Sequence, residues 1–148
     1  MNELQAHDLI KKAIEADMAY RKAFVSVYKD NSRCAEVIET MKMNIGIGEQ
    51  LLNELGHVCY INEFVNKLKS LKAHHHHEFE KTSDLKERRR VFGPIPMLSV
   101  LLEQAEVFVA AIDEEIDETE YVLNHFGPFD DDSDELYDEE DILKIWND

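Results

Sequence analysis

The chain has 148 residues, of which 44% are hydrophobic, and this is enough to form the core of one domain. Its formal net charge of −16 at pH 7 disfavours direct binding to nucleic acid or to an anionic membrane, because the phosphates would repel it. We see no apolar run near the ~20 residues that span a bilayer and no secretion signal in the polar N-terminus.

Helical periodicity dominates the chain, which contains few glycines and prolines. The pattern predicts a first helix over Glu3–Tyr28. The polar residues 30–32 break this helix and offer caps for a second helix that runs to about Leu55. Gly46 and Gly48 lie inside the second helix, where each costs about 1 kcal/mol against alanine. We therefore expect a kink or a close helix contact at these glycines.

Beyond a bend at Gly56, an apolar stripe predicts a third helix from Ile61 to about Ala73. The segment 74–84, which begins with four histidines, is predicted to be a loop. Asp84 is placed to cap a short helix, and the residues Phe92–Pro94 end that helix. The middle of the chain is therefore expected to alternate between helices and polar connections.

The last long helix has the clearest pattern, with apolar residues stepping at three and four up to Phe126. Pro96 fits its first turn, where a proline loses no needed hydrogen bond. We therefore predict an all-α fold, a helical bundle of about four long helices plus one or two short ones. Residues 1–128 are expected to form the bundle domain. Residues 129–148 are expected to form an acidic extension that ends in a short amphipathic helix.

Groups that could carry chemistry are few. Glu54 and His57 form one ExxH motif on a predicted helix, but carboxylate-bridged di-iron bundles need two such motifs. The run His74–His77, in a predicted loop, lacks the fixed geometry of a closed metal site. Cys34 and Cys59 are expected to be buried, reduced thiols, with a disulfide as the alternative. The sequence predicts no catalytic residue, no metal site and no cofactor.

The acidity is concentrated in the last third of the chain. Residues 97–148 hold eighteen acids against one base and carry a net charge of −17, whereas residues 1–96 carry +1. Nine of those acids lie between Asp130 and Asp141. An asymmetry of this kind indicates a specialised interaction surface. The arginines Arg88–Arg90 are expected to pair with the acidic helix.

Six acids lie within eight residues of the last helix, opposite its apolar stripe. Like charges three and four apart destabilise a helix, and acids near its C-terminus oppose the helix dipole. A helix rises ~1.5 Å per residue, close to the ~1.7 Å of axis per charge in duplex DNA. The layout therefore favours a role in binding. The predicted partner-binding residues are Asp113, Glu114, Glu115, Asp117, Glu118, Glu120, Asp130, Asp131, Asp132, Asp134, Glu135, Asp138, Glu139, Glu140, Asp141 and Trp146.

In composition the chain is similar to the small acidic helical DNA-mimic inhibitors that phages use against host nucleases and defence systems, although no motif carries the likeness. This predicts a non-enzymatic cytoplasmic protein (in the host cytoplasm if it is viral) that occupies a basic, nucleic-acid-binding surface of a partner protein. One alternative is a small assembly protein of a virion or oligomeric complex, and a homodimer is left open. A second alternative is a metal-dependent enzyme built on Glu54, His57 and other carboxylates.

Overall fold

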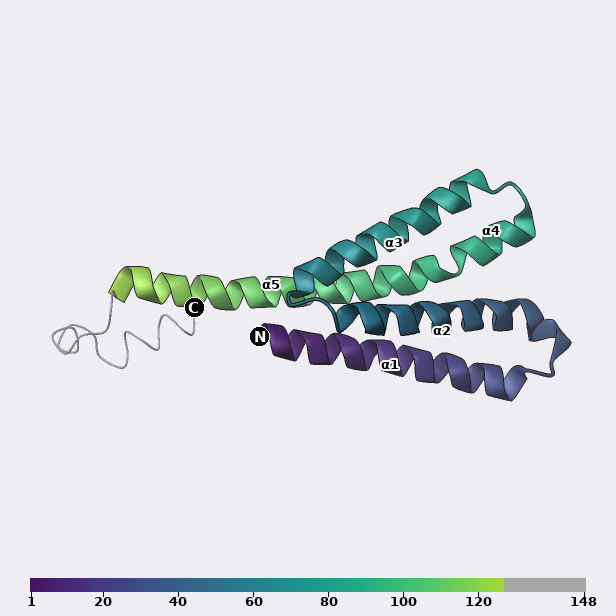
Figure 1. Ribbon diagram of the computed structural model, residues 1–148, viewed down its shortest axis with the longest axis horizontal. Helices are drawn as coiled ribbons and strands as arrows, with labels where there is room; N and C mark the ends of the chain where they lie inside the picture. Colours follow the sequence, from purple (N-terminus) through teal and green to yellow (C-terminus); the bar gives the residue numbers. More distant parts are fainter. Residues whose placement is uncertain (127–148) are drawn as a thin grey trace. The chain divides into compact units, whose positions relative to one another are not determined.

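The computed structural model describes residues 1–126 of the chain and the side chains of residues 1–114 (Figure 1). Every regular element in that range is a helix, which confirms the predicted all-α bundle of four long helices and short ones. The chain divides into two units, Met1–Ile112 (unit 1) and Asp113–Asp148. The predicted boundary near residue 128 lies outside the described residues. In chain order the elements are α1 (Glu3–Tyr28), η1 (Ser32–Cys34), α2 (Ala35–Leu55), α3 (Ile61–Lys81), α4 (Leu85–Phe92) and α5 (Pro94–Phe126).

Helix α1 begins at a complete capping box. The Asn2 side chain accepts a hydrogen bond from the Gln5 backbone N–H at 2.8 Å, and the Gln5 side chain accepts one from the Asn2 N–H at 3.0 Å. Two of the N–H groups that a helix start leaves without partners are satisfied in this way. The helix then runs alongside α2, to which it is joined by a short turn (Figure 1).

The core of unit 1 draws on four helices. Its fully buried side chains include Ile14 of α1, Leu51 of α2, Phe64 of α3 and Leu98 of α5. Each comes from a stripe in which apolar residues recur every three or four positions, so that one face of each helix turns inward. Because one cluster joins these four helices, unit 1 has a single hydrophobic core.

The two glycines of α2 have different surroundings. A Cβ built on Gly48 would lie 2.7 Å from Cγ of Met18, so α1 and α2 approach closely there. Gly46 has no such neighbour within 4 Å, and α2 is continuous through both residues. The prediction of a close helix contact is therefore confirmed at Gly48 alone.

The cysteines differ from the prediction in their burial. Both are free, but Cys34 is only half-buried and Cys59 is exposed. Cys59 lies in the turn between α2 and α3 and not in a helix. Helix α2 ends before Gly56 and α3 begins at Ile61, so the Cys59 thiol lies on the connection between them and not on an apolar helix face.

The histidine run is helical, so the prediction of a loop over residues 74–84 was wrong for residues 74–81 and correct only for residues 82–84. Helix α3 extends to Lys81 and ends at the cap residue Thr82, which adopts an extended conformation. No glycine or proline interrupts this stretch, and histidine costs a helix only a few tenths of a kcal/mol more than the better formers, about 0.7 kcal/mol at most. Tertiary contacts add to this, because the Phe79 ring lies 5.7 Å from the Phe92 ring of α4.

The last helix begins at Pro94, so Pro96 is its third residue and lies in the first turn, as predicted. Gly93 keeps helical backbone angles, with φ −49° and ψ −40°, so α4 and α5 follow each other with almost no loop. The Asn44 side chain, buried in α2, donates a hydrogen bond from Nδ2 to the Gly93 carbonyl at 3.3 Å. Proline suits the first position of α5 because its missing N–H would have no partner there.

The segment Leu85–Glu114 is long and apolar enough to cross a membrane by length and composition alone. This revises the expectation that no run approaches that length. A mostly buried core helix of a soluble protein passes the same test, and here 33% of the apolar window is buried. Leu98, Leu101 and Ala105 of this segment belong to the core of unit 1.

Candidate interaction surface

Six predicted partner-binding acids lie on α5, on either side of Glu114, the last residue whose side chain the structure describes. Asp113 and Glu114 are exposed. Glu115, Asp117, Glu118 and Glu120 lie on the same uninterrupted helix, which continues to Phe126, but their side chains are not described. We call these six residues the acidic ridge.

The other predicted partner-binding residues, from Asp130 to Asp141 together with Trp146, lie outside the described residues. The predicted amphipathic turn at Ile142–Trp146 lies there as well. The structure therefore neither brings these residues together with the acidic ridge nor separates them from it.

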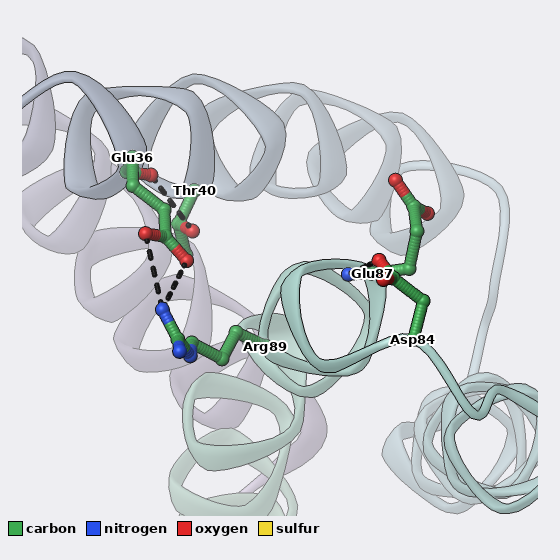
Figure 2. A network of polar contacts seen from close by, with 5 residues as sticks. All are labelled: Glu36, Thr40, Asp84, Glu87 and Arg89. Carbon is green, nitrogen blue, oxygen red and sulfur yellow. Dashed lines mark hydrogen bonds and ion pairs between the residues drawn. The ribbon is translucent and has the colours of Figure 1, made fainter.

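The three arginines of α4 contact described residues of unit 1. The predicted pairing with the acidic helix stays a prediction, because the side chains from residue 115 onward are not described. Nη1 of Arg89 lies 3.3 Å from Oε1 of Glu36 on α2 (Figure 2). Arg90 pairs with Glu87 within α4 at 3.4 Å. The Arg88 guanidinium lies 4.4 Å from the centre of the Phe79 ring. Each of the three arginine side chains therefore interacts with a nearby residue of α2, α3 or α4.

Charged side chains of both signs surround a hollow between α2 and α4. Its volume is about 520 Å³, and its lining includes Glu39, Lys42, Lys86 and Arg90. Figure 2 shows the start of α4, where the Asp84 carboxylate accepts a hydrogen bond from the Glu87 N–H at 3.1 Å. Because three acids and three bases line it, the hollow has no single charge that would select an anion or a cation. No local sequence pattern indicates this hollow, because the residues of its two walls lie about fifty positions apart along the chain.

The ExxH pair is not assembled with further ligands. Nδ1 of His57 lies 2.6 Å from the carbonyl of Asn53, one turn earlier. The Glu54 carboxylate accepts a long hydrogen bond from Gln50 at 3.5 Å. Within residues 1–114, no group of three or more His, Cys, Asp and Glu side chains is placed to hold a metal ion.

The histidine run contains one residue with an altered pKa. Burial lowers the pKa of His75 below the 6.5 that is ordinary for histidine, the neighbouring His74 lowers it further, and Glu78 opposes both. The rings of His74 and His75 meet edge to face, 5.6 Å apart. His75 is therefore a candidate for a pH-dependent contribution to folding.

Comparisons with protein-family models, with curated proteins and with solved structures found no match to this chain. The function must therefore be argued from the chain's own residues.

Proposed function

We propose that this chain is a non-enzymatic interaction protein whose acidic last third occupies a basic, nucleic-acid-binding surface of a partner protein, in the manner of a DNA mimic. The observation that carries the proposal is the continuity of α5. One helix runs without a break through all six positions of the acidic ridge and on to Phe126. Its ~1.5 Å rise per residue allows it to present charges at a spacing near that of duplex DNA.

The charges of unit 1 support this assignment. Residues 1–96 carry a net charge of only +1, and Arg88–Arg90 contact Phe79, Glu36 and Glu87. The described part of α5 forms one cross-helix ion pair, between Glu106 and Lys69 at 3.6 Å. These described contacts give the bases partners within unit 1, which supports an acidic ridge whose charge is available to a cationic partner.

In this proposal the C-terminal residues Ile142, Leu143, Ile145 and Trp146 supply an apolar anchor beside the acids. Acidic residues speed the encounter with a basic surface. A buried tryptophan is among the side chains that most often dominate the affinity of an interface. The acids that speed the encounter and the apolar residues that anchor the complex would thus lie in neighbouring parts of one segment.

The test is a binding assay with a matched charge control. The ridge variant converts the six ridge acids to their amides. The control variant converts six exposed acids of unit 1 instead: Asp30, Glu39, Glu49, Glu63, Glu80 and Glu103. Purified proteins with known DNA-binding grooves are presented to the immobilised full chain, and bound protein is then challenged with duplex DNA and with salt.

We expect at least one groove protein to bind, to be displaced by DNA and to lose affinity as salt rises, because screening weakens charge contacts. The ridge variant should bind roughly tenfold or more weakly, and the control variant should bind almost as the parent does. If both variants lost affinity equally, binding would depend on net charge and not on the acidic ridge, and this would contradict the proposal. Binding that DNA does not compete would contradict the mimic.

A further inference from the structure

The ring of His7, in the second turn of α1, contacts two carbonyl oxygens at once. Its Nδ1 lies 2.9 Å from the carbonyl of Glu3, one turn earlier in the same helix. Its Nε2 lies 3.1 Å from the carbonyl of Val58, 51 positions away in the connection between α2 and α3. The half-buried ring therefore bridges the start of α1 and the residues that lead into α3.

Both ring nitrogens need a proton in this arrangement. A carbonyl oxygen only accepts hydrogen bonds, and a neutral imidazole has a proton on one nitrogen and a lone pair on the other. Whichever nitrogen lacked the proton would direct its lone pair at a carbonyl oxygen. Only the imidazolium, which carries a proton on both nitrogens, donates to Glu3 and to Val58 together.

The two carbonyls differ in how much they depend on His7. Glu3 lies inside α1, where backbone carbonyls accept hydrogen bonds from the next turn of the helix. The Val58 carbonyl lies outside any helix, and its hydrogen-bond partner within residues 1–114 is the His7 ring alone. Losing the proton from Nε2 would therefore leave the Val58 carbonyl without a donor from this part of the protein.

The first turn of α1 makes a second bond to the same connection. The Glu3 carboxylate accepts a hydrogen bond from the backbone N–H of Ile61 at 2.9 Å. Residues 58–61 are thus held through a donor, the His7 ring, and through an acceptor, the Glu3 carboxylate. The negative charge of Glu3, four residues before His7 on the same helix, also favours a positive charge on the ring.

The charged groups around the ring have partners of their own or lie on neighbouring turns. Asp8 pairs with Lys12 at 2.9 Å, Glu106 of α5 pairs with Lys69 of α3, and Nδ1 of His57 contacts the Asn53 carbonyl. The other titratable groups on these turns are the N-terminal ammonium, Lys11, Glu54, Cys59, Tyr60 and Glu63. No carboxylate of the described residues forms an ion pair with the His7 ring, so its two hydrogen bonds are both to neutral carbonyls.

We infer that His7 is held as an imidazolium and forms, with Glu3, a proton-dependent latch between the start of α1 and the connection that leads into α3. The inference does not depend on the proposed function, because it uses only unit 1 and none of the acidic ridge. The folded chain offers the protonated ring two acceptors at fixed positions, so folding favours the protonated form. The latch therefore contributes more to stability as pH falls through the range of about pH 8 to 5 in which histidine gains its charge.

The test compares His7 with a matched histidine of the full chain. His57 is the control, because among the described residues only its Nδ1 has a carbonyl partner. The nitrogen chemical shifts of each ring, followed by NMR as pH is changed, report which nitrogens carry a proton. His7→Gln and His57→Gln remove one titrating group each. Urea unfolding of the parent and both variants at about pH 7.5 and about pH 5.5 then measures the coupling to stability. The titration of every other group, including His75, cancels in the comparison.

We expect both ring nitrogens of His7 to keep their protons at a pH at which His57 has already become neutral. From the higher to the lower pH, the unfolding equilibrium constant of His7→Gln should rise roughly fivefold or more relative to that of the parent, as one charge-assisted hydrogen bond implies. His57→Gln should follow the parent. If His7 lost its proton at the same pH as His57, the inference would be overturned, whether or not the variants fold. An equal pH response of His7→Gln and the parent would also overturn it.

Discussion

The carboxylate of Glu3, in the first turn of α1, accepts a hydrogen bond from the backbone N–H of Ile61, the first residue of α3, at 2.9 Å. The cap residue of α3, Tyr60, has no side-chain capping bond of its own. An acid from a distant part of the chain therefore satisfies one of the N–H groups that the start of α3 leaves open, and places a negative charge at the positive end of its dipole.

Replacing Glu3 by alanine should destabilise the fold by about 1 to 2 kcal/mol, the usual cost of losing an N-terminal cap. Glu3→Gln should lose less, because an amide oxygen still accepts the hydrogen bond while the charge is gone. Urea unfolding of both variants measures the difference. If the two variants were equally stable, the hydrogen bond to the Ile61 N–H would add nothing measurable beyond the charge. If Glu3→Ala were as stable as the parent, the contact would not contribute to the stability of the fold.

Gly48 and Gly46 form a matched pair for the packing of α1 against α2. We expect Gly48→Val to cost about 1 to 3 kcal/mol through overpacking, since its Cβ would meet the Met18 side chain at 2.7 Å. Gly46→Ala should instead stabilise the protein by up to about 1 kcal/mol, since alanine favours the helix and no neighbour lies within 4 Å. Thermal unfolding of both variants tests the sign of each effect. A tolerated Gly48→Val would show that the Met18 side chain can move away from residue 48 at little cost.

Much of this fold could be read from local sequence, and the misses have physical causes. The bounds Glu3–Tyr28 were predicted correctly because caps and apolar spacing are local signals. The histidine run was misjudged, since composition suggested a loop whereas contacts of Phe79 with α4 hold it in the helix. The Glu3–Ile61 bond joins residues 58 positions apart, and no pattern within one helix reveals such a partner.

The candidate sites also differ in how local their sequence signal is. The acidic ridge is a run of neighbouring residues, so composition alone was enough to find it. Among the described residues the acidic partners of Arg89 and Arg90 are Glu36 and Glu87, which short-range geometry places beside them and which net charge alone does not single out.

His75 should make stability depend on pH. Its pKa in the folded protein is lowered, chiefly by burial, so the unfolded chain binds a proton more readily. This contribution to stability is complete above the ordinary pKa of 6.5 and is lost as pH falls below it. The parent should therefore lose more stability than His75→Gln between about pH 7.5 and about pH 5.5. The effect should be modest because solvent still reaches the ring.

The measurement is urea unfolding of both proteins at the two pH values, so that the titration of the carboxylates cancels in the comparison. His76→Gln, at an exposed position of the same helix, is the control and should follow the parent. An identical pH response in the parent and His75→Gln would show that burial of this ring does not couple folding to protonation.

Asn44 should be the least replaceable polar residue of the core. Its side chain is 1% exposed, and its Oδ1 has no hydrogen-bond partner among the described residues, while its Nδ2 donates to the Gly93 carbonyl. Asn44→Asp removes this donor and puts an acid where no described group donates to it. A carboxylate there would be costly to ionise. We expect a loss of more than about 3 kcal/mol at neutral pH, most of it recovered as pH falls and the acid is protonated.

Asn44→Ala separates the two contributions. It loses the bond to the Gly93 carbonyl and leaves a small cavity, but it buries no charge. Its cost should be about 1 to 3 kcal/mol and should not change with pH beyond the change seen in the parent. Unfolding curves of the parent and both variants at acidic and neutral pH decide the matter. If Asn44→Asp tracked Asn44→Ala at every pH, water would have to reach residue 44, and the junction of α4 and α5 would be less tightly covered than its burial implies.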